Sequence, residues 1–192
     1  MRLAMILALG LANLATSAVA QTSDAGADHA LSTSLAATVK AMHASIRRDL
    51  AEAAESMPAE NYGFRPTPQV RTFAQLVGHV TNVNLLFCSG AKGEPYPAKS
   101  NAENLTTKDD ALAALRASLA YCDAVYQDTT DANFGDRTTI AGFGNKPTLT
   151  SRGATLIFNT AHNNEHYGNM VDYLRLKGLV PPSTARVQPG RR

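Results

Sequence analysis

Two histidines near the end of the chain, His162 and His166, stand four residues apart in a segment with a helical pattern. Four residues make about one helical turn, so both imidazole rings project from the same face of the helix. Two such rings can bind one divalent ion, because each Nε2 can approach it to about 2.0–2.1 Å. An ordinary surface or core pair has the same spacing, so the pair alone does not establish a metal site.

The helix that carries this pair is predicted by signals at both of its ends. Thr150 or Ser151 can act as the N-cap, because a side-chain oxygen there accepts a hydrogen bond from an unpaired backbone N–H. At the other end, Gly178 follows two basic residues and precedes Pro181 and Pro182. Cations in the last turn, then glycine, then proline form a typical stop signal, so we expect the helix to end there.

A third histidine, His79, lies in a second predicted helix that runs to about Ser89. This helix begins with a capping box, in which the side chains of Thr72 and Gln75 satisfy each other's backbone donors. Apolar residues stand one turn from His79 on both sides, so its ring is expected to point inward. A buried, unpaired histidine must be neutral and hydrogen-bonded, and such a core histidine is the alternative to a metal ligand.

The first predicted helix runs from about His29 to Met57, with apolar residues at three- and four-residue steps. His43 follows Met42 in this helix and has no histidine or cysteine at helical spacing. We therefore expect His43 at the surface or boundary of the helix rather than on a metal.

The third helix is expected to open near Thr107, because the acidic residues just after it suit the positive N-terminal end of a helix. A long connection from Asp128 to Leu149 follows and can hold a short hairpin in its second half, from Thr138 onward. Its Gly142-Phe-Gly144 segment lacks the third glycine of a dinucleotide-binding fingerprint.

The N-terminal segment has the pattern of a secretory signal peptide. Arg2 precedes an apolar run, and Ala18-Val19-Ala20 forms a small-x-small cleavage site. Such a segment is removed on maturation, and an uncleaved anchor is the alternative. We therefore expect an exported protein, periplasmic or secreted. The predicted organisation is a signal peptide at residues 1–20, a linker at 21–28, one helical domain at 29–183 and a disordered tail at 184–192.

The charge balance argues against a strongly basic binding surface. The chain has 18 basic and 16 acidic residues, and loss of Arg2 with the signal peptide leaves one excess positive charge. Proteins that bind nucleic acid or anionic membranes electrostatically carry a marked excess of lysine and arginine. No later stretch is apolar enough to cross a bilayer. We therefore expect neither nucleic acid nor, after cleavage, a membrane as a partner.

The two cysteines, Cys88 and Cys122, lie late in the second and third predicted helices. An exported protein allows them to form a disulfide, and two buried free thiols are the alternative. A disulfide needs Cα atoms within about 7 Å, and antiparallel neighbours would hold these two residues at opposite ends. Pairing therefore requires the two helices to be parallel, and the long crossover from Gly90 to Thr107 permits this.

Three motifs occur in order along the chain: Pro58-x-x-x-Tyr62-x-Phe64-x-Pro66, then Thr72-Phe-x-x-Leu-Val-x-His79, then His162-x-x-x-His166-Tyr-Gly-Asn with Tyr-Leu-Arg-x-x-Gly178-x-x-Pro181-Pro182. Together they resemble the DinB/YfiT-like superfamily over nearly the whole mature chain. The resemblance implies an all-α fold, a four-helix bundle in up-down-down-up order with a long crossover between helices two and three. It also implies a metal site formed by His79, His162 and His166.

The resemblance also implies an activity. Some relatives are similar to metal-dependent transferases that use a low-molecular-weight thiol, and one branch isomerises maleylpyruvate with such a thiol. We therefore expect zinc or nickel at the site, activating a thiol or water for transfer to, or hydrolysis of, a small-molecule substrate. Glu165 is the candidate base. The side chains expected to support the ligand rings are Asn159, Asn163 and Tyr173.

Two other interpretations stay open. The bundle could bind a metal or a small apolar ligand without turnover, or the histidines could be hydrogen-bonded core residues of a structural protein. Cytoplasmic thiols are expected to be scarcer outside the cytoplasm, so activation of water for hydrolysis is an open variant in an exported protein. Bundles of this family often pair through helix faces, so a homodimer is a further expectation. Convergence of the three rings in an open pocket would keep catalysis possible, whereas a site closed by a fourth protein ligand would favour the structural or binding interpretation.

Overall fold

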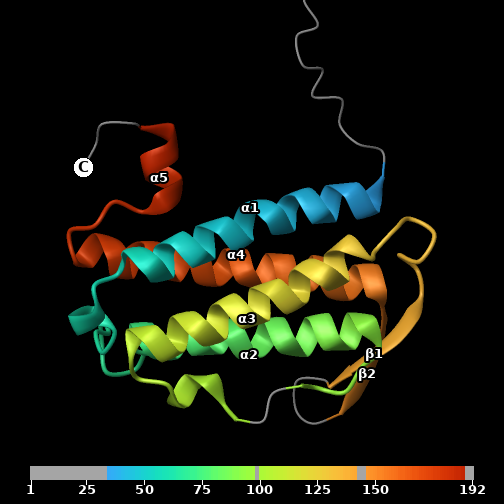
Figure 1. The fold of residues 1–192 in the computed structure, drawn as a ribbon, viewed down its shortest axis with the longest axis horizontal. Helices are drawn as coiled ribbons and strands as arrows, with labels where there is room; N and C mark the ends of the chain where they lie inside the picture. The colour runs from blue at the N-terminus through green and yellow to red at the C-terminus, as the bar shows by residue number, and fades with distance from the viewer. Residues whose placement is uncertain (1–33, 98–99, 142–145, 189–192) are drawn as a thin grey trace, which may run out of the picture. The chain divides into compact units, whose positions relative to one another are not determined.

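Four long helices dominate the structure, a computed structural model of the 192-residue chain (Figure 1). It describes residues 34–97, 100–141 and 146–188, which all belong to one unit, Ser32–Arg192. The predicted signal peptide (residues 1–20) and linker (21–28) lie outside the described residues. So do residues 29–33 of the first predicted helix.

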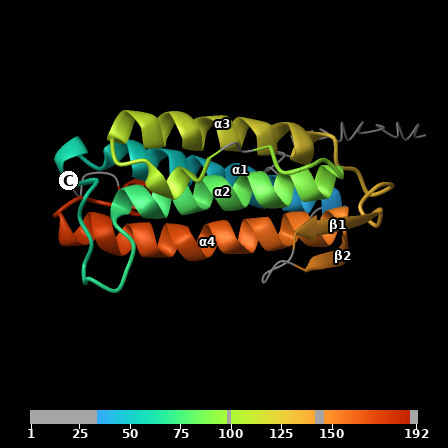
Figure 2. The same ribbon diagram turned by 90° about the horizontal axis from the view of Figure 1, so that it is seen from below.

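In chain order the elements are α1 (Leu35–Ser56), the 3-10 turn η1 (Ala59–Asn61), α2 (Phe73–Lys92), the 3-10 turn η2 (Ala102–Asn104), α3 (Lys108–Gln127), β1 (Arg137–Ala141), β2 (Pro147–Ser151), α4 (Arg152–Leu176) and α5 (Pro182–Val187). Helices α2 and α3 run in the same direction, and α1 and α4 run the opposite way (Figures 1 and 2). Helix α2 packs against both α3 and α4. This is the predicted up-down-down-up bundle, and the prediction of fold class is confirmed.

The helix ends follow the signals in the sequence. Oγ1 of Thr72 accepts from the backbone N–H of Gln75 at 3.2 Å, and Oε1 of Gln75 accepts from the N–H of Thr72 at 2.9 Å. Ser151, one of the two candidate caps of α4, accepts from the N–H of Ala154 at 3.3 Å. Beyond α4, Gly178 has a φ of 74°, a left-handed conformation that glycine adopts without steric cost.

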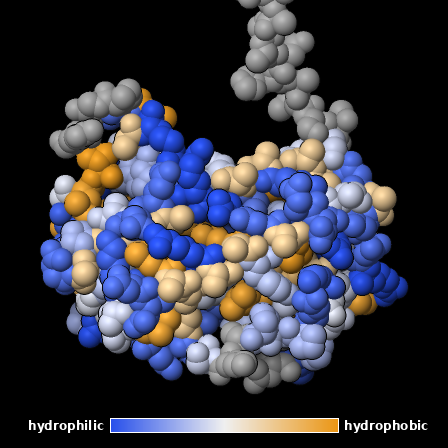
Figure 3. Space-filling view, in the orientation of Figure 1, coloured by the Kyte–Doolittle hydropathy of each residue, from blue (hydrophilic) through white to orange (hydrophobic). Residues whose placement is uncertain are grey.

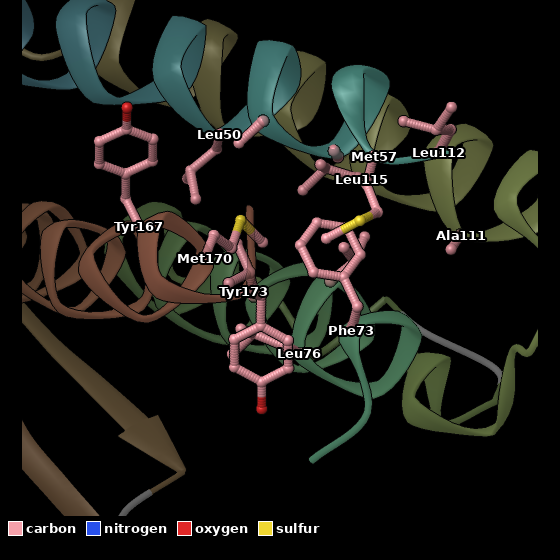
Figure 4. Close-up of a cluster of buried hydrophobic side chains, with 14 of the residues drawn as sticks. Leu50, Met57, Phe73, Leu76, Ala111, Leu112, Leu115, Tyr167, Met170 and Tyr173 are labelled. Carbon is pink, nitrogen blue, oxygen red and sulfur yellow. The ribbon is translucent and has the colours of Figure 1, made fainter. Parts of the chain in front are cut away.

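Apolar side chains from all four long helices fill the interior and point toward one another (Figure 4). Each long helix contributes fully buried residues to this cluster, among them Leu50 of α1, Phe73 of α2, Leu115 of α3 and Met170 of α4. Burial of a side chain of this size contributes about 1.5–3 kcal/mol to stability. The core therefore fixes α2 against α4, the two helices that carry the histidines.

Cys88 in α2 and Cys122 in α3 form a disulfide with their Cα atoms 5.3 Å apart. Both residues are fully buried. They occupy similar positions near the C-terminal ends of their helices, so the bond fits the parallel arrangement of α2 and α3.

Strands β1 and β2 form an antiparallel hairpin in the region where the sequence predicts one, and Arg137 pairs with Ser151. Residues 142–145 between the strands, which include the Gly142-Phe-Gly144 segment, lie outside the described residues. The hairpin packs on the C-terminal end of α2 at Gly90. A Cβ at Gly90 would lie 2.3 Å from Cγ2 of Ile140, so any larger residue at this position would displace the side chain of Ile140.

The prediction of a disordered tail is wrong for residues 184–187, which belong to helix α5. The sequence predicts disorder from residue 184, whereas Pro182–Val187 form a short helix and only residues 189–192 of the tail lie outside the described residues. Proline is well suited to the first position of a helix, so the prolines that stop α4 also start α5. Arg186 of α5 forms ion pairs with Asp49 and Glu52 of α1, which ties this helix to the bundle.

The prediction that His43 lies at the surface or boundary of its helix is wrong. Its side chain is 3% exposed, and its ring stacks on that of Tyr126, with 3.7 Å between centroids and 6° between planes. Met42, one of the apolar residues at helical spacing in α1, is instead 50% exposed. The buried face of α1 therefore passes through His43.

Hydrophilic residues predominate on the face formed by α1 and α3, with apolar residues scattered among them (Figure 3). None of the described helices combines the length and the apolar character that crossing a bilayer requires.

Candidate metal centre

Three imidazole rings from two helices lie close together. His79 is on α2, and His162 and His166 are one turn apart on α4. One ring nitrogen from each lies within 4.8 Å of the others, and the ring centroids are 4.2–5.2 Å apart. The packing of α2 against α4 brings together histidines that are far apart in the sequence. We call these residues the three-histidine cluster.

The surroundings of the cluster favour neutral imidazole. Burial, reinforced by the other two imidazoles and by Arg71, lowers the pKa of His162 to about 3. Burial and the neighbouring His79 also lower the pKa of His166 from its ordinary value of 6.5. A neutral imidazole carries the lone pair that binds a metal. At neutral pH the two histidines of α4 are therefore in the form that can act as ligands.

The spacing of the pair on α4 suits one ion. Nε2 of His162 and Nε2 of His166 are 3.0 Å apart. Two nitrogens bound at 2.0–2.1 Å to one tetrahedral ion are separated by roughly 3.3 Å. The pair therefore needs only a small adjustment to bind a single ion through both Nε2 atoms.

Glu103, on η2 in the crossover, belongs to this site but was not among the residues predicted. Its Oε1 lies 2.9 Å from Nδ1 of His79, and its Oε2 lies 3.0 Å from Nε of Arg71. Burial acts to raise the pKa of Glu103, but the hydrogen bonds from Arg71 and His79 outweigh it and lower the pKa overall. Because Glu103 is thus ionised, Nδ1 of His79 must donate, which leaves Nε2 of His79 available to an ion.

Asn169 contacts the cluster from α4 itself. Its Nδ2 lies 3.2 Å from Nδ1 of His166. A rotation of this amide by 180° presents Oδ1 instead, and Nδ1–H of His166 then donates and leaves Nε2 for an ion. Asn169 follows His166 by three residues, a spacing that places two side chains on the same helix face, so helical spacing is the signal that marks it.

Asn159 and Asn163, predicted to support the ligand rings, bond to other groups. Nδ2 of Asn159 lies 3.2 Å from the hydroxyl of Tyr126, and Nδ2 of Asn163 lies 2.9 Å from Oδ1 of Asn84. Both asparagines are fully buried. An α-helix turns by about 100° per residue, so Asn163 faces the interior of the bundle rather than the ring of its neighbour His162.

Tyr173, the third residue predicted to support the rings, also bonds elsewhere. Its hydroxyl donates to the backbone oxygen of Arg71 at 2.5 Å. Its ring nevertheless lines a pocket of about 1060 Å³ that reaches His166, together with Arg71 and Glu103. Tyr173 therefore shapes the approach to the cluster without contacting a ligand nitrogen.

A second pocket, of about 480 Å³, is lined by the whole three-histidine cluster together with Phe158, Ala161 and Glu165. Glu165, the candidate base, is exposed and makes no ion pair among the described residues. The structure thus places a carboxylate on the wall of the pocket into which the imidazoles face. The pocket leaves room for a small molecule beside them.

Comparisons with known proteins agree with this fold. The family model of the DinB superfamily matches residues 42–170. A solved structure of a DinB-like protein from Bacillus cereus is similar, with a TM-score of 0.58 and 17% identity, over 71% of this chain and 89% of that chain. At that identity the likeness concerns the fold alone. No curated protein matches the chain. Because the family model covers more than half of its residues, the chain belongs to the DinB superfamily.

Proposed function

We propose that this protein is a metal-dependent enzyme that binds one divalent ion through His79, His162 and His166. The observation that carries the proposal is the convergence of three imidazoles at a pocket with room for another ligand. Catalytic zinc sites combine three protein ligands with an open position in this way, whereas structural sites are closed by a fourth protein ligand.

The donor set fits zinc or nickel, since imidazole nitrogen suits both. A divalent ion in such a site supplies Lewis acidity, which lowers the pKa of a thiol or water ligand. The reaction that we propose is transfer of a thiol to a small electrophilic substrate, or hydrolysis of that substrate. The thiol would be a low-molecular-weight cofactor.

The residues around the cluster have separable roles in this proposal. His79, His162 and His166 act as neutral ligands. Glu165, on the wall of the smaller pocket, would accept a proton from the thiol or water. Phe158 gives the same pocket an apolar wall against which a substrate can pack.

We also propose that the protein acts after export, in a periplasm or outside the cell. The buried disulfide between Cys88 and Cys122 supports this location, since disulfides persist in oxidising compartments. Residues 1–20 carry the signal-peptide pattern. Hydrolysis is the variant that such a compartment favours. We further propose that the substrate is a small molecule and that the protein forms a homodimer.

The test compares wild-type protein, purified without a histidine tag, with two variants of α4. We expect one metal ion per chain in the wild type and loss of that ion in His162→Ala. Asn164→Ala changes an exposed neighbour outside the cluster and should keep the ion. An aryl halide, offered with and without a small thiol, then separates transfer from hydrolysis. Stoichiometric metal in His162→Ala would contradict the assignment, and bound metal without turnover would favour a binding protein.

A further inference from the structure

The turn η2 is held against α2 on both sides of His79. On one side, a Cβ at Gly78 would lie 2.3 Å from the backbone oxygen of Ala102, so only glycine allows this approach. On the other side, Oδ1 of Asn82 accepts from the backbone N–H of Ala102 at 3.0 Å, and Nδ2 of Asn82 donates to Oδ1 of Asn101 at 2.6 Å. The crossover is therefore docked directly beside the cluster ligand of α2.

Docking places one carboxylate in a defined position. Oδ1 of Asn101 accepts from the backbone N–H of Glu103 at 2.9 Å, which fixes the turn that carries this residue. The carboxylate of Glu103 then spans Nδ1 of His79, at 2.9 Å, and Nε of Arg71, at 3.0 Å. The side chains of His79 and Glu103 are 19% and 25% exposed, so the hydrogen bond between them is partly shielded from water.

Arg71 connects a third segment to the same carboxylate. It immediately precedes Thr72, the N-cap of α2, and its backbone oxygen accepts from the hydroxyl of Tyr173 on α4. Glu103 therefore stands where the crossover, the loop before α2 and the two histidine-bearing helices meet.

We propose that Glu103 is a positioning residue for the metal site, and that docking of η2 on α2 is coupled to metal binding. The inference rests on the metal site proposed above. A carboxylate that accepts from Nδ1–H holds His79 in the tautomer whose Nε2 lone pair is free for the ion. Coupling between two equilibria is reciprocal, so an ion in the cluster must stabilise the docked turn as much as the docked turn strengthens binding of the ion.

The first test measures the affinity for Zn²⁺ by competition with a chromogenic chelator. We expect Glu103→Ala to weaken binding by about 10- to 100-fold, the usual effect of removing a carboxylate behind a histidine ligand. Glu103→Gln keeps an oxygen that can accept from Nδ1–H and should recover much of the affinity. Gly78→Ala removes no polar group but displaces the turn, so it should weaken binding in the same direction.

The matched control is Glu94→Ala. Glu94 is a carboxylate of the same crossover, but it pairs with Lys92 and Tyr121 instead of a histidine of the cluster. Its removal should leave the affinity for Zn²⁺ unchanged.

Two further measurements do not depend on affinity alone. Nitrogen-15 NMR of the metal-free protein should show His79 protonated at Nδ1 in the wild type and a mixture of tautomers in Glu103→Ala. Hydrogen exchange of the backbone amides of Asn104 and Leu105, which close η2, should slow on addition of Zn²⁺ in the wild type.

The outcomes separate this inference from the proposed function. If the wild-type protein bound no Zn²⁺, both the proposed metal site and the positioning role of Glu103 would be contradicted. Tight binding that Glu103→Ala leaves unchanged would overturn the positioning role alone. Exchange in η2 that Zn²⁺ leaves unchanged would overturn the coupling.

Discussion

Nε2 of His43 on α1 lies 2.9 Å from Oδ1 of Asp123 on α3. The same carboxylate forms an ion pair with Arg47 at 3.0 Å, and the imidazole stacks on Tyr126. Burial lowers the pKa of His43, and this effect outweighs the hydrogen bond and charge of Asp123, which act to raise it. His43 is therefore a neutral imidazole within the folded protein at neutral pH, in a part of the bundle that the metal site does not use.

We expect this arrangement to make stability depend on pH. The ordinary pKa of histidine is 6.5, and in the folded state that of His43 is lower, so below about pH 6.5 protons bind preferentially to the unfolded chain. Stability should therefore fall as the pH falls. His43→Phe keeps a ring against Tyr126 but removes the titration. Its melting temperature should fall less than that of the wild type between about pH 7.5 and about pH 5.

The comparison also controls for the other histidines. His162 and His166 titrate in both proteins, so their contribution cancels in the difference between the two melting curves. If the wild type and His43→Phe lost the same stability over this pH range, the buried imidazole would not be the cause.

Removal of the proposed metal should lower the melting temperature of the wild type. An ion that binds only the folded state stabilises it by about 2.7 kcal/mol at a free concentration of 100 times its Kd. Calorimetry after dialysis against a chelator, followed by titration with Zn²⁺ or Ni²⁺, measures the effect. His166→Ala lacks one ligand and should respond to neither step. If neither the chelator nor the added metal changed the melting temperature of the wild type, the proposed metal site would be contradicted.

Loss of the disulfide should destabilise the bundle strongly. The bridge joins residues with a sequence separation of 34, and the chain-entropy account assigns about 4 kcal/mol to a loop of that length. The double variant Cys88→Ala/Cys122→Ala should unfold at a lower urea concentration than the oxidised wild type. Reductant should move the wild type toward the same midpoint and leave the variant unaffected. Equal midpoints for the oxidised wild type and the variant would refute the prediction.

The hydrogen bond between Asn84 and Asn163 links α2 to α4 in a fully buried position. Asn84→Ala removes the acceptor and leaves a buried amide donor unpaired, which should cost about 1–3 kcal/mol of unfolding free energy. In the double variant Asn84→Ala/Asn163→Ala no donor is left unpaired, so the loss should be smaller than the sum of the two single losses. Urea unfolding of all four proteins measures the coupling, and strictly additive losses would show that the bond contributes nothing.

Most of the fold could be predicted because its signals are local. The capping box of Thr72 and Gln75, the cap at Ser151 and the stop at Gly178 each depend on residues within one or two turns. Backbone groups at helix ends need partners wherever the helix is packed, so such signals survive in the tertiary structure.

The error at His43 has a different origin. His43 follows Val39 by four residues and precedes Ile46 by three, so helical spacing alone places it on the same face as those buried residues. The apolar character of Met42 favours burial of that residue instead, but the fold leaves Met42 half exposed. Position on the helix decides burial here, and residue type does not.

Glu103 could not be predicted in this way. Its position depends on how the crossover docks on α2, and no periodic pattern marks a residue of an irregular segment. The sequence shows a glycine, Gly78, beside His79, but it does not show that the backbone of Ala102 occupies the space that this glycine leaves. Similarly, Asn159 is one of the side chains expected to support the ligand rings, and only the packing shows that its amide contacts Tyr126 instead.

The bond between Cys88 and Cys122 closes the intervening chain into a covalent ring, and Glu103 is part of that ring. A protease that cuts once in the crossover would open the ring without releasing a fragment. The nicked molecule would run as a single band on a gel without reductant and as two bands with it. In an oxidising compartment, one such cut would therefore leave the halves bearing His79 and His162 covalently joined.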